Sequence, residues 1–309
     1  MIRIPGGTFR MGSDDHYPEE KPAHSVSVDG FWIDPTPVTN AQFRAFVQAT
    51  GYVTWAEIPP DPRDYPGARP DMLKAGGLVF TPPSRPVNLE DWSQWWRFTF
   101  GANWRRPLGK GSHIGGLEDH PVVQVAVRDA EAYAKWAGKE LPTEAEFEFA
   151  ARGGLDDAEF AWGDELTPGG IHMANTWQGD FPHQNSRADG WARTSPVRAF
   201  PPNGYGVHDM IGNVWEWTTD WYSARHEADS GKACCVPQNP RGAPVDQSYD
   251  AHDPIRIPRK VLKGGSHLCA PSYCKRYRPA ARHAEQIDTT TSHVGFRCVV
   301  RAKAPAVPT

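Results

Sequence analysis

Glycine and proline are the residues that most restrict how this chain can fold. The sequence contains 29 glycines and 30 prolines, about a fifth of its 309 residues. Proline lacks a backbone donor and glycine is costly to order, so both interrupt long helices and central strands. The proportion stays below the range typical of low-complexity chains. We therefore expect a folded protein with many loops, beneath which the 13 tryptophans pack as large apolar groups.

The length of the chain is compatible with one large domain. A chain of 309 residues can bury roughly 75% of the surface that its unfolded form exposes. No stretch has the composition of a flexible linker, and no internal repeat is visible. We predict a single domain over residues 1–303, followed by a short C-terminal tail, 304–309.

Three segments carry the signals of short amphipathic helices. "TNAQFRAFVQATG" (39–51) begins with a capping box, Thr39 with Gln42, and ends at a glycine. "PTEAEFEFAARGG" (142–154) repeats the capping-box spacing, and "RDAEAYAKWAGK" (128–139) places its aromatic residues on one face. We predict three helices, all before residue 155.

The strand signals are short. Alternation or β-branched runs mark "HSVSVDGFWI" (24–33), "PVVQVAV" (121–127) and "GFRCVVRA" (295–302). Residues 52–120 and 218–260 have little periodicity, and we interpret them as long ordered loops. The expected class is α+β: a single irregular, loop-rich domain with few short helices and small antiparallel sheets.

Charge and hydropathy exclude several partners. The net charge is -4, with 33 basic and 37 acidic residues interspersed, which is not the pattern of a protein that binds nucleic acid or an anionic membrane. No apolar run approaches the ~18 residues of a membrane span, and the N-terminus lacks the pattern of a signal peptide. We expect a cytoplasmic protein, and a monomer.

Cys269 and Cys274 form the most informative local pattern, in "GGSHLCAPSYCKRYRPAAR" (264–282). Three interpretations remain open: buried packing or a local disulfide, a zinc site, and a Cu(I) site, for which two thiolates are suitable soft ligands. Structural zinc needs four ligands, and no second closely spaced pair of this kind exists. Cys234 and Cys235 are adjacent in a polar loop, and Cys298 lies in an apparent core strand.

At these residues the sequence resembles a known family, the formylglycine-generating enzymes or sulfatase-modifying factors. The cysteine pair separates the oxidases of this family from relatives that share the scaffold. The resemblance implies a variant C-type-lectin-like fold, with residues 1–303 as a single catalytic domain. It is carried by "IPGGTFRMGS", "DPTPVTNAQFRAFV", "GANWRRP", "HPVVQVAVRDAEAYAKWAGKELPTEAEFEFAARGG", "FPPNGYGVHDMIGNVWEWTTDWY", "KGGSHLCAPSYCKRYRPAAR" and "GFRC".

The resemblance also implies an activity. Enzymes of this family use O2 to oxidise a cysteine in a C-x-P-x-R motif of an unfolded or nascent sulfatase chain to Cα-formylglycine. By carry-over, Cys269 and Cys274 would bind Cu(I), with Ser266, Trp215 and Tyr273 lining the pocket. Each of the last three also has a purely structural interpretation: a turn residue, a core tryptophan and a packed tyrosine, respectively.

Two oxygen-rich sets match the family's structural calcium sites, because hard cations prefer carboxylate and carbonyl ligands. The first comprises Asn175, Thr176, Asp189 and Trp191, and the second Asp209, Gly212, Val214 and Glu216. Asp and Asn are also common in loops, where they cap turns.

The chain departs from the family at four positions. Ala151 and Pro279 stand where secreted members have cysteines, which leaves Cys298 without its partner and supports a cytoplasmic form. Ala270 and His293 replace a histidine and an asparagine near the site.

Two other functions are compatible with the scaffold. An iron-dependent sulfoxide synthase would need a His-x-x-x-His-x-Glu motif, which none of the 12 histidines forms. A non-catalytic lectin-like binding or maturation protein would not need the cysteine pair. For the oxidase, we expect an extended substrate in a groove near Trp95, Trp96 or Trp104, each of which could instead fill the core.

Overall fold

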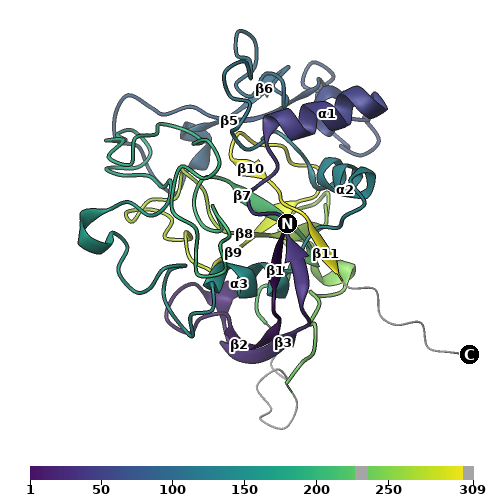
Figure 1. The fold of residues 1–309 in the computed structure, drawn as a ribbon. Helices are drawn as coiled ribbons and strands as arrows, with labels where there is room; N and C mark the ends of the chain where they lie inside the picture. Colours follow the sequence, from purple (N-terminus) through teal and green to yellow (C-terminus); the bar gives the residue numbers. More distant parts are fainter. Residues whose placement is uncertain (227–235, 302–309) are drawn as a thin grey trace, which may run out of the picture.

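The computed structural model describes residues 1–226 and 236–301, so Cys234, Cys235 and the tail 304–309 lie outside the described residues. In that part of the chain, short elements are embedded in loops (Figure 1), as expected for the predicted α+β, loop-rich fold. The α-helices are α1 (Asn40–Thr50), α2 (Val127–Trp136) and α3 (Glu144–Arg152). The strands are β1 (Ile2–Ile4), β2 (Gly7–Met11), β3 (His24–Val28), β4 (Phe31–Ile33), β5 (Gly76–Phe80), β6 (Trp96–Phe100), β7 (Trp215–Trp221), β8 (Arg259–Lys263), β9 (Arg282–Gln286), β10 (Val294–Gly295) and β11 (Val299–Arg301). Single 3-10 turns are η1 (Pro18–Glu20), η2 (Trp55–Glu57), η3 (Trp92–Gln94), η4 (Pro168–Gly170) and η6 (Val245–Gln247).

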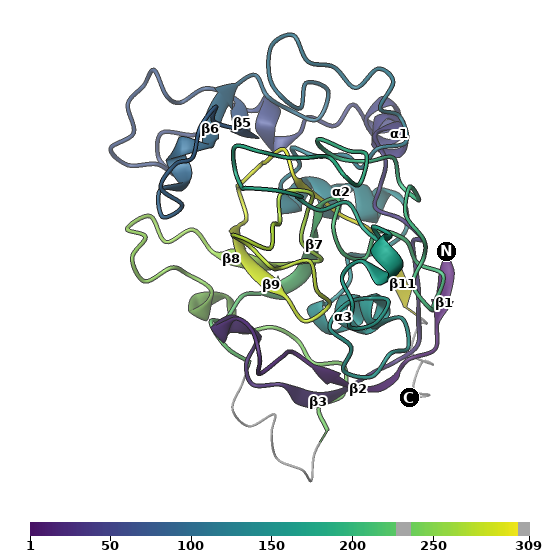
Figure 2. The same ribbon diagram turned by 90° about the vertical axis from the view of Figure 1, so that its left-hand side faces the viewer.

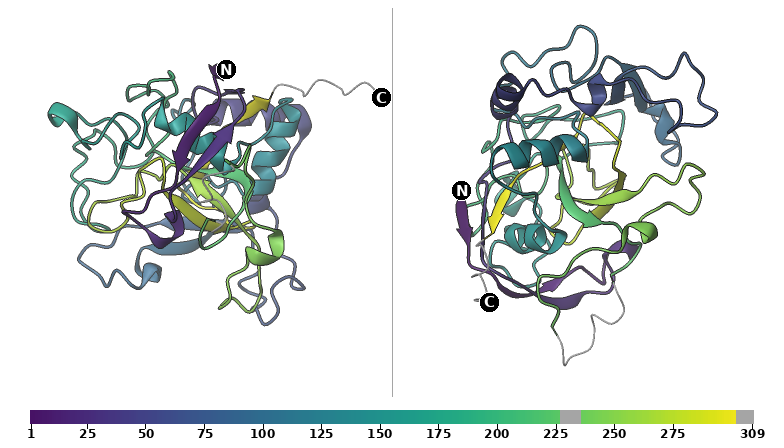
Figure 3. Two further views of the ribbon diagram at one scale, coloured as in Figure 1. Left: turned by 90° about the horizontal axis from the view of Figure 1, so that it is seen from below. Right: turned by 90° about the vertical axis from the view of Figure 1, so that its right-hand side faces the viewer.

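The strands form four small sheets. The central one has the order β10-β7-β8-β9, and a second sheet, β1-β4-β11, joins the two ends of the chain, as Figure 3 shows. The pairs β2-β3 and β5-β6 are separate two-stranded ribbons, and β5-β6 projects at one end of the molecule (Figure 2). All pairings are antiparallel except β10 with β7, which is parallel, so the expectation of antiparallel sheets holds with one exception.

The helices begin and end where local signals predicted. At α1 the Thr39 hydroxyl accepts from the Gln42 amide at 3.3 Å and the Gln42 side chain accepts from the Thr39 amide at 2.9 Å. Gly51 then ends the helix in the left-handed conformation. Helix α3 is capped in the same way by Thr143 and Glu146. None of the helices in residues 1–226 and 236–301 is long and apolar enough to cross a bilayer.

The strand predicted at 121–127 is wrong. Val122 and Val125 are fully buried, but Gln124 between them has a φ of 61°, which breaks an extended strand. The Gln124 side chain donates to the carbonyls of Leu78 and Pro107. The apolar run is therefore a buried loop whose polar residue ties it to its neighbours.

The other strand predictions are correct only in part. Residues 24–33 form two strands, β3 and β4, which belong to different sheets. Residues 295–302 are split in the same way between β10 and β11, since Arg297 turns inward to pair with Glu216. The segment 52–120, predicted as loop, contains β5 and β6.

Helix α3 carries three buried carboxylates that amphipathic patterning would place in water. Glu144, Glu146 and Glu148 are 3%, 7% and 0% exposed. Each pairs with a cation from a distant part of the chain: the N–O distances are 2.7 Å to Arg282, 2.7 Å to Arg301 and 2.9 Å to Lys263, respectively. Buried charges require such partners. The pairs fix α3 against β8, β9 and β11, on the opposite side of the central sheet from α1 and α2 (Figure 1).

Candidate active site

Two tight turns after β8 bring the predicted cysteines together. The amide of Cys269 donates to the carbonyl of Ser266 at 2.9 Å, and the amides of Tyr273 and Cys274 both donate to the carbonyl of Ala270, at 3.1 and 2.9 Å. The Sγ atoms of Cys269 and Cys274 consequently lie 3.5 Å apart, and both thiols are free. We call residues 264–278 the cysteine loop.

Gly265 allows the cysteine loop to close on itself. Its φ is 72°, and an added Cβ would lie 2.6 Å from the carbonyl oxygen of Arg276. This contact places Ser266 beside the cysteines: its amide donates to Cys269 Sγ at 3.4 Å, and its hydroxyl accepts from the Leu268 amide at 3.2 Å. Ser266 is thus buried in the site, where it also has the turn role expected of it.

The two thiols have different surroundings. Cys269 is 2% exposed, and burial raises its pKa well above the usual value. Cys274 is only partly buried, and its pKa is lowered to about 6 by the hydrogen bond from Cys269 and by the guanidinium of Arg276. Arg276 Nη1 lies 3.8 Å from Cys274 Sγ. At neutral pH the pair therefore holds a thiolate on Cys274 next to a protonated thiol on Cys269.

Aromatic rings form one wall of the site. Tyr273 is 39% exposed and stacks on Phe181 with ring centroids 4.5 Å apart. Trp95 packs edge-on against Tyr273 at 5.6 Å, and Phe80 stacks on Phe181 at 5.8 Å. Trp215, which begins β7, is buried in the same apolar cluster as the cysteines. The residues predicted to line the site are therefore gathered around or beneath it.

The three tryptophans proposed for a substrate groove have different positions. Trp104 is 1% exposed and packs on Phe43 in the main core, the structural alternative considered for it. Trp95 is buried behind Tyr273. Trp96 is only partly buried, and its ring lies 4.8 Å from that of His293, whose Nδ1 is 2.6 Å from the Thr291 hydroxyl. Of the three, Trp96 is the one a ligand can contact.

The first predicted calcium set is assembled around Asp189. Its carboxylate accepts from the amides of Thr176, at 3.1 Å, and Trp191, at 2.9 Å, and from the Gln178 side chain. Asn175 is 1% exposed, and its Oδ1 is buried without a hydrogen-bond partner. A buried oxygen of this kind fits a cation ligand, because it otherwise costs free energy.

The second predicted set has a different arrangement. Both carboxylate oxygens of Glu216 accept from Arg297, at 2.8 and 2.7 Å, and both side chains are fully buried. Asp209 accepts from the Arg198 amide at 3.0 Å, and burial raises its pKa. Arg297 supplies the positive charge that a cation would bring, so Glu216 fits an ion pair. Calcium at Asp209, Gly212, Val214 and Glu216 stays a prediction that requires Arg297 to share its partner.

The cysteine pair fits Cu(I) through its donor chemistry. The 3.5 Å between the sulfurs is less than twice a metal–thiolate bond of ~2.3 Å, so both can contact one ion. Within residues 1–226 and 236–301, no group of three or more His, Cys, Asp or Glu side chains could hold a metal. An ion at the pair would therefore have two soft ligands, and Cu(I) tolerates few ligands of this type. Cys298 is fully buried in the core and is free, as expected for a packing residue.

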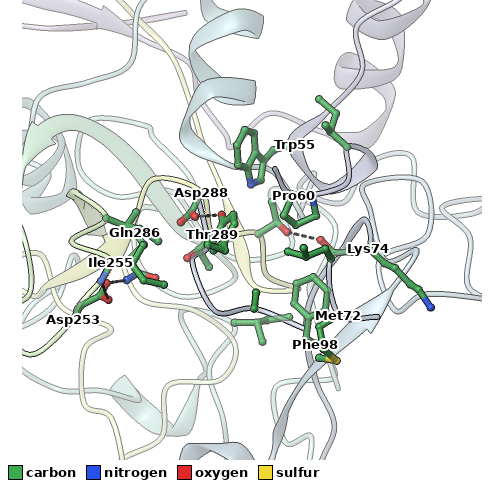
Figure 4. Close-up of a pocket in the computed structure, with 18 residues that line it drawn as sticks. Trp55, Pro60, Met72, Lys74, Phe98, Asp253, Ile255, Gln286, Asp288 and Thr289 are labelled. Carbon is green, nitrogen blue, oxygen red and sulfur yellow. Dashed lines mark hydrogen bonds between the residues drawn. The ribbon is translucent and has the colours of Figure 1, made fainter. Parts of the chain in front are cut away.

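A pocket of about 490 Å³ lies near the open edge of this region (Figure 4). Asp253, Gln286 and Asp288 lie on one side of it, and Met72 and Phe98 on the other. Gln286 donates to Asp253 at 2.7 Å, and the Tyr65 hydroxyl donates to Asp288. Sequence reasoning missed this pocket, because its walls come from segments that were interpreted as featureless loops.

Known proteins resemble this chain over almost its whole length. The family description "Sulfatase-modifying factor enzyme 1-like domain" matches residues 1–302. The chain is 56% identical over 300 residues to the formylglycine-generating enzyme of Mycobacterium tuberculosis, which covers 97% of each chain. It is 43% identical over 301 residues to the enzyme of that name from Mus musculus, covering 96% of this chain and 74% of the relative.

Other relatives show that the scaffold also occurs with other names. The chain is 36% identical over 310 residues to a Bos taurus protein named "Inactive C-alpha-formylglycine-generating enzyme 2", covering 99% of this chain and 89% of the relative. Among solved structures, PvdO from Pseudomonas aeruginosa matches with a TM-score of 0.60 at 23% identity, over 97% of this chain and 93% of PvdO. That similarity concerns the fold alone. The extent and identity of the sequence matches show that the chain belongs to the family of sulfatase-modifying factors, the formylglycine-generating enzymes and their relatives.

Proposed function

We propose that this protein converts a cysteine in a C-x-P-x-R motif of a sulfatase chain to Cα-formylglycine, with Cu(I) as cofactor and O2 as oxidant. Relatives named formylglycine-generating enzyme, at 56% and 43% identity, support the activity. Since an inactive relative is also similar, the argument depends on one observation: Cys269 and Cys274 lie 3.5 Å apart beside a partly exposed aromatic wall.

The side chains divide the work by their chemistry. Cys269 and Cys274 would hold Cu(I), which when bound supplies a soft redox centre for the substrate sulfur and for O2. Ser266 lies at the buried base of the loop, where its amide donates to Cys269 Sγ and holds that sulfur in place. Tyr273, stacked on Phe181, presents a rigid and partly exposed ring that limits water around the reacting carbon. Oxidation removes two hydrogens and two electrons from the CH2–SH group, and hydrolysis then exchanges sulfur for oxygen.

We propose further that the acidic pocket receives the motif arginine. Phe80 and Trp96 are cross-strand partners beside the aromatic wall, and Leu78 and Phe98, the next pair on the same face of β5-β6, line the pocket. In an extended peptide the arginine lies about 13 Å from the cysteine, at ~3.3 Å per residue. Apolar walls suit the arginine stem, and the carboxylates of Asp253 and Asp288 suit its charge (Figure 4).

Peptide turnover tests the activity. The Cu(I)-loaded protein is incubated with O2, a thiol reductant and a C-x-P-x-R peptide, and product mass is measured. We expect the aldehyde from the parent, and none from Cys269→Ser or Cys274→Ser, because serine is a hard and weakly acidic donor. A parent that is folded and copper-loaded but yields no aldehyde would refute the proposal.

The arginine pocket is tested separately. Asp253→Asn/Asp288→Asn should raise the peptide KM by about tenfold or more, since hydrogen bonds to charged groups contribute ~1.5–3 kcal/mol. A peptide with leucine in place of arginine is the control, because its KM should respond little to the same change. Equal effects on both peptides would place the arginine elsewhere.

A further inference from the structure

A segment near the N-terminus packs against the cysteine loop. The Lys275 amide donates to the Tyr17 hydroxyl at 3.1 Å, and the Arg276 guanidinium lies 3.7 Å from the centre of the Tyr17 ring. Glu19 Oε1 accepts from Arg276 Nε at 3.1 Å and from Nη2 at 2.6 Å. Two edges of the guanidinium and one of its faces are thus in contact with residues 17–19.

The remaining nitrogen of Arg276 reaches the site. Nη1 lies 3.8 Å from Cys274 Sγ, within hydrogen-bonding distance for sulfur. Since the guanidinium is planar and rigid, fixing Nε and Nη2 on Glu19 also fixes the direction of Nη1. Glu19 and Tyr17 consequently determine where the Arg276 donor meets the sulfur of Cys274.

Cys274 needs this external support more than Cys269 does. The Cys269 sulfur is buried and receives the Ser266 amide at 3.4 Å. The Cys274 sulfur is partly exposed, and its contacts in the described structure are Cys269 and Arg276. Without Arg276, Cys274 would lose the donor that selects one orientation of its side chain.

The neighbouring pair Arg278–Glu20 provides a contrast. It is bidentate, at 2.6 and 2.8 Å, and fully buried, but neither side chain contacts a cysteine sulfur. Glu20 therefore anchors the segment, whereas Glu19 acts on Arg276. Two adjacent acids have separate roles.

We propose that Tyr17 and Glu19 are positioning residues, which hold Arg276 so that its Nη1 orients the Cys274 sulfur for Cu(I). This inference rests on the proposed copper site. It assigns a role to an N-terminal segment 257 residues away in sequence. Partners that orient metal ligands typically change metal affinity by 10–100-fold when they are mutated.

The test compares Cu(I) affinity by competition with a chromophoric Cu(I) chelator. Arg276→Lys keeps the charge but cannot contact Glu19 and Cys274 at once in a planar fork, so affinity should fall by about 10–100-fold. Glu19→Ala should have a similar effect, and Glu19→Gln, which keeps an acceptor, a smaller one. Turnover should fall through kcat, with the peptide KM within about twofold of the parent, because ground-state peptide binding does not involve this contact.

Glu159→Gln is the matched control. Glu159 pairs with Lys275 of the same loop at 2.8 Å, and Lys275 contacts no sulfur through its side chain, so Cu(I) affinity should stay at the parent value. Melting temperatures identify any variant that fails to fold, and Glu19→Gln, the mildest change, keeps the test decisive.

The outcomes separate this inference from the proposed function. A folded parent that binds no Cu(I) would refute both. A parent that binds Cu(I), with Arg276→Lys and Glu19→Ala binding as tightly as Glu159→Gln, would refute the positioning role alone.

Discussion

Removing the buried carboxylate of Glu148 should destabilise the protein strongly. This side chain is fully buried, and it accepts from Lys263 at 2.9 Å, Arg152 at 2.8 Å and the Gly12 amide at 2.9 Å. Lys263 is itself fully buried. In Glu148→Ala both cations would lose their counter-charge in a medium of low polarity, and breaking a buried pair in this way costs ~3–5 kcal/mol.

The pKa of Glu148 gives a second measure of the same interaction. Burial by itself would raise this pKa, but the charges of Lys263 and Arg152 outweigh burial and lower it from 4.5 to about 2. A difference of this size corresponds to roughly 3 kcal/mol of folding free energy, at 1.36 kcal/mol per pKa unit. The two values agree within their precision.

Thermal unfolding provides the assay. For a chain of this size, each kcal/mol should shift Tm by roughly 2 °C, so Glu148→Ala should lower Tm by about 6–10 °C. Asp71→Ala, which removes the partner of the exposed Arg69, is the control and should change Tm little, because surface pairs contribute little to stability. If Glu148→Ala melted within about 2 °C of the parent, water or a rearranged partner must neutralise Lys263, and the reasoning from burial would be refuted.

Four further outcomes are expected. The stability advantage of the parent over Glu148→Gln should be complete above about pH 4.5 and decline as the pH falls toward 2, because the folded pKa is depressed; urea unfolding across this range measures it, and a constant difference would contradict it. Cys298→Ser should leave turnover nearly unchanged while lowering Tm, since this thiol is buried away from the loop; loss of turnover in a folded variant would oppose this. Trp104→Ala should cost ~3–5 kcal/mol of stability, whereas Trp96→Ala should mainly raise the peptide KM; the reverse pattern in melting and kinetics would place the groove wrongly. A calcium chelator should lower Tm in the parent and less in Asn175→Ala, whose buried oxygen is the proposed ligand; an unchanged melt with no bound divalent ion would exclude the site.

Much of the local structure could be predicted from sequence. The capping boxes at Thr39 and Thr143 and the glycine at position 51 act within one helical turn, and the helices begin and end there. The strand at 121–127 was predicted wrongly for the complementary reason. Its apolar run correctly indicated burial, but the positive φ of Gln124 depends on the carbonyls of Leu78 and Pro107, which no local pattern reveals.

The candidate site divides along the same line. The spacing of Cys269 and Cys274, with the resemblance of the surrounding motifs, was enough to identify the pair, because a turn of five residues brings the sulfurs together by itself. The partners of the site were decided by tertiary structure. Arg276 meets Glu19, and Glu216 meets Arg297, across long stretches of chain, and an ion pair between distant residues leaves no periodicity or spacing in the sequence. Short-range hydrogen bonds and steric limits are encoded within a few residues, whereas the neutralisation of buried charge depends on which distant segments the packed core brings into contact.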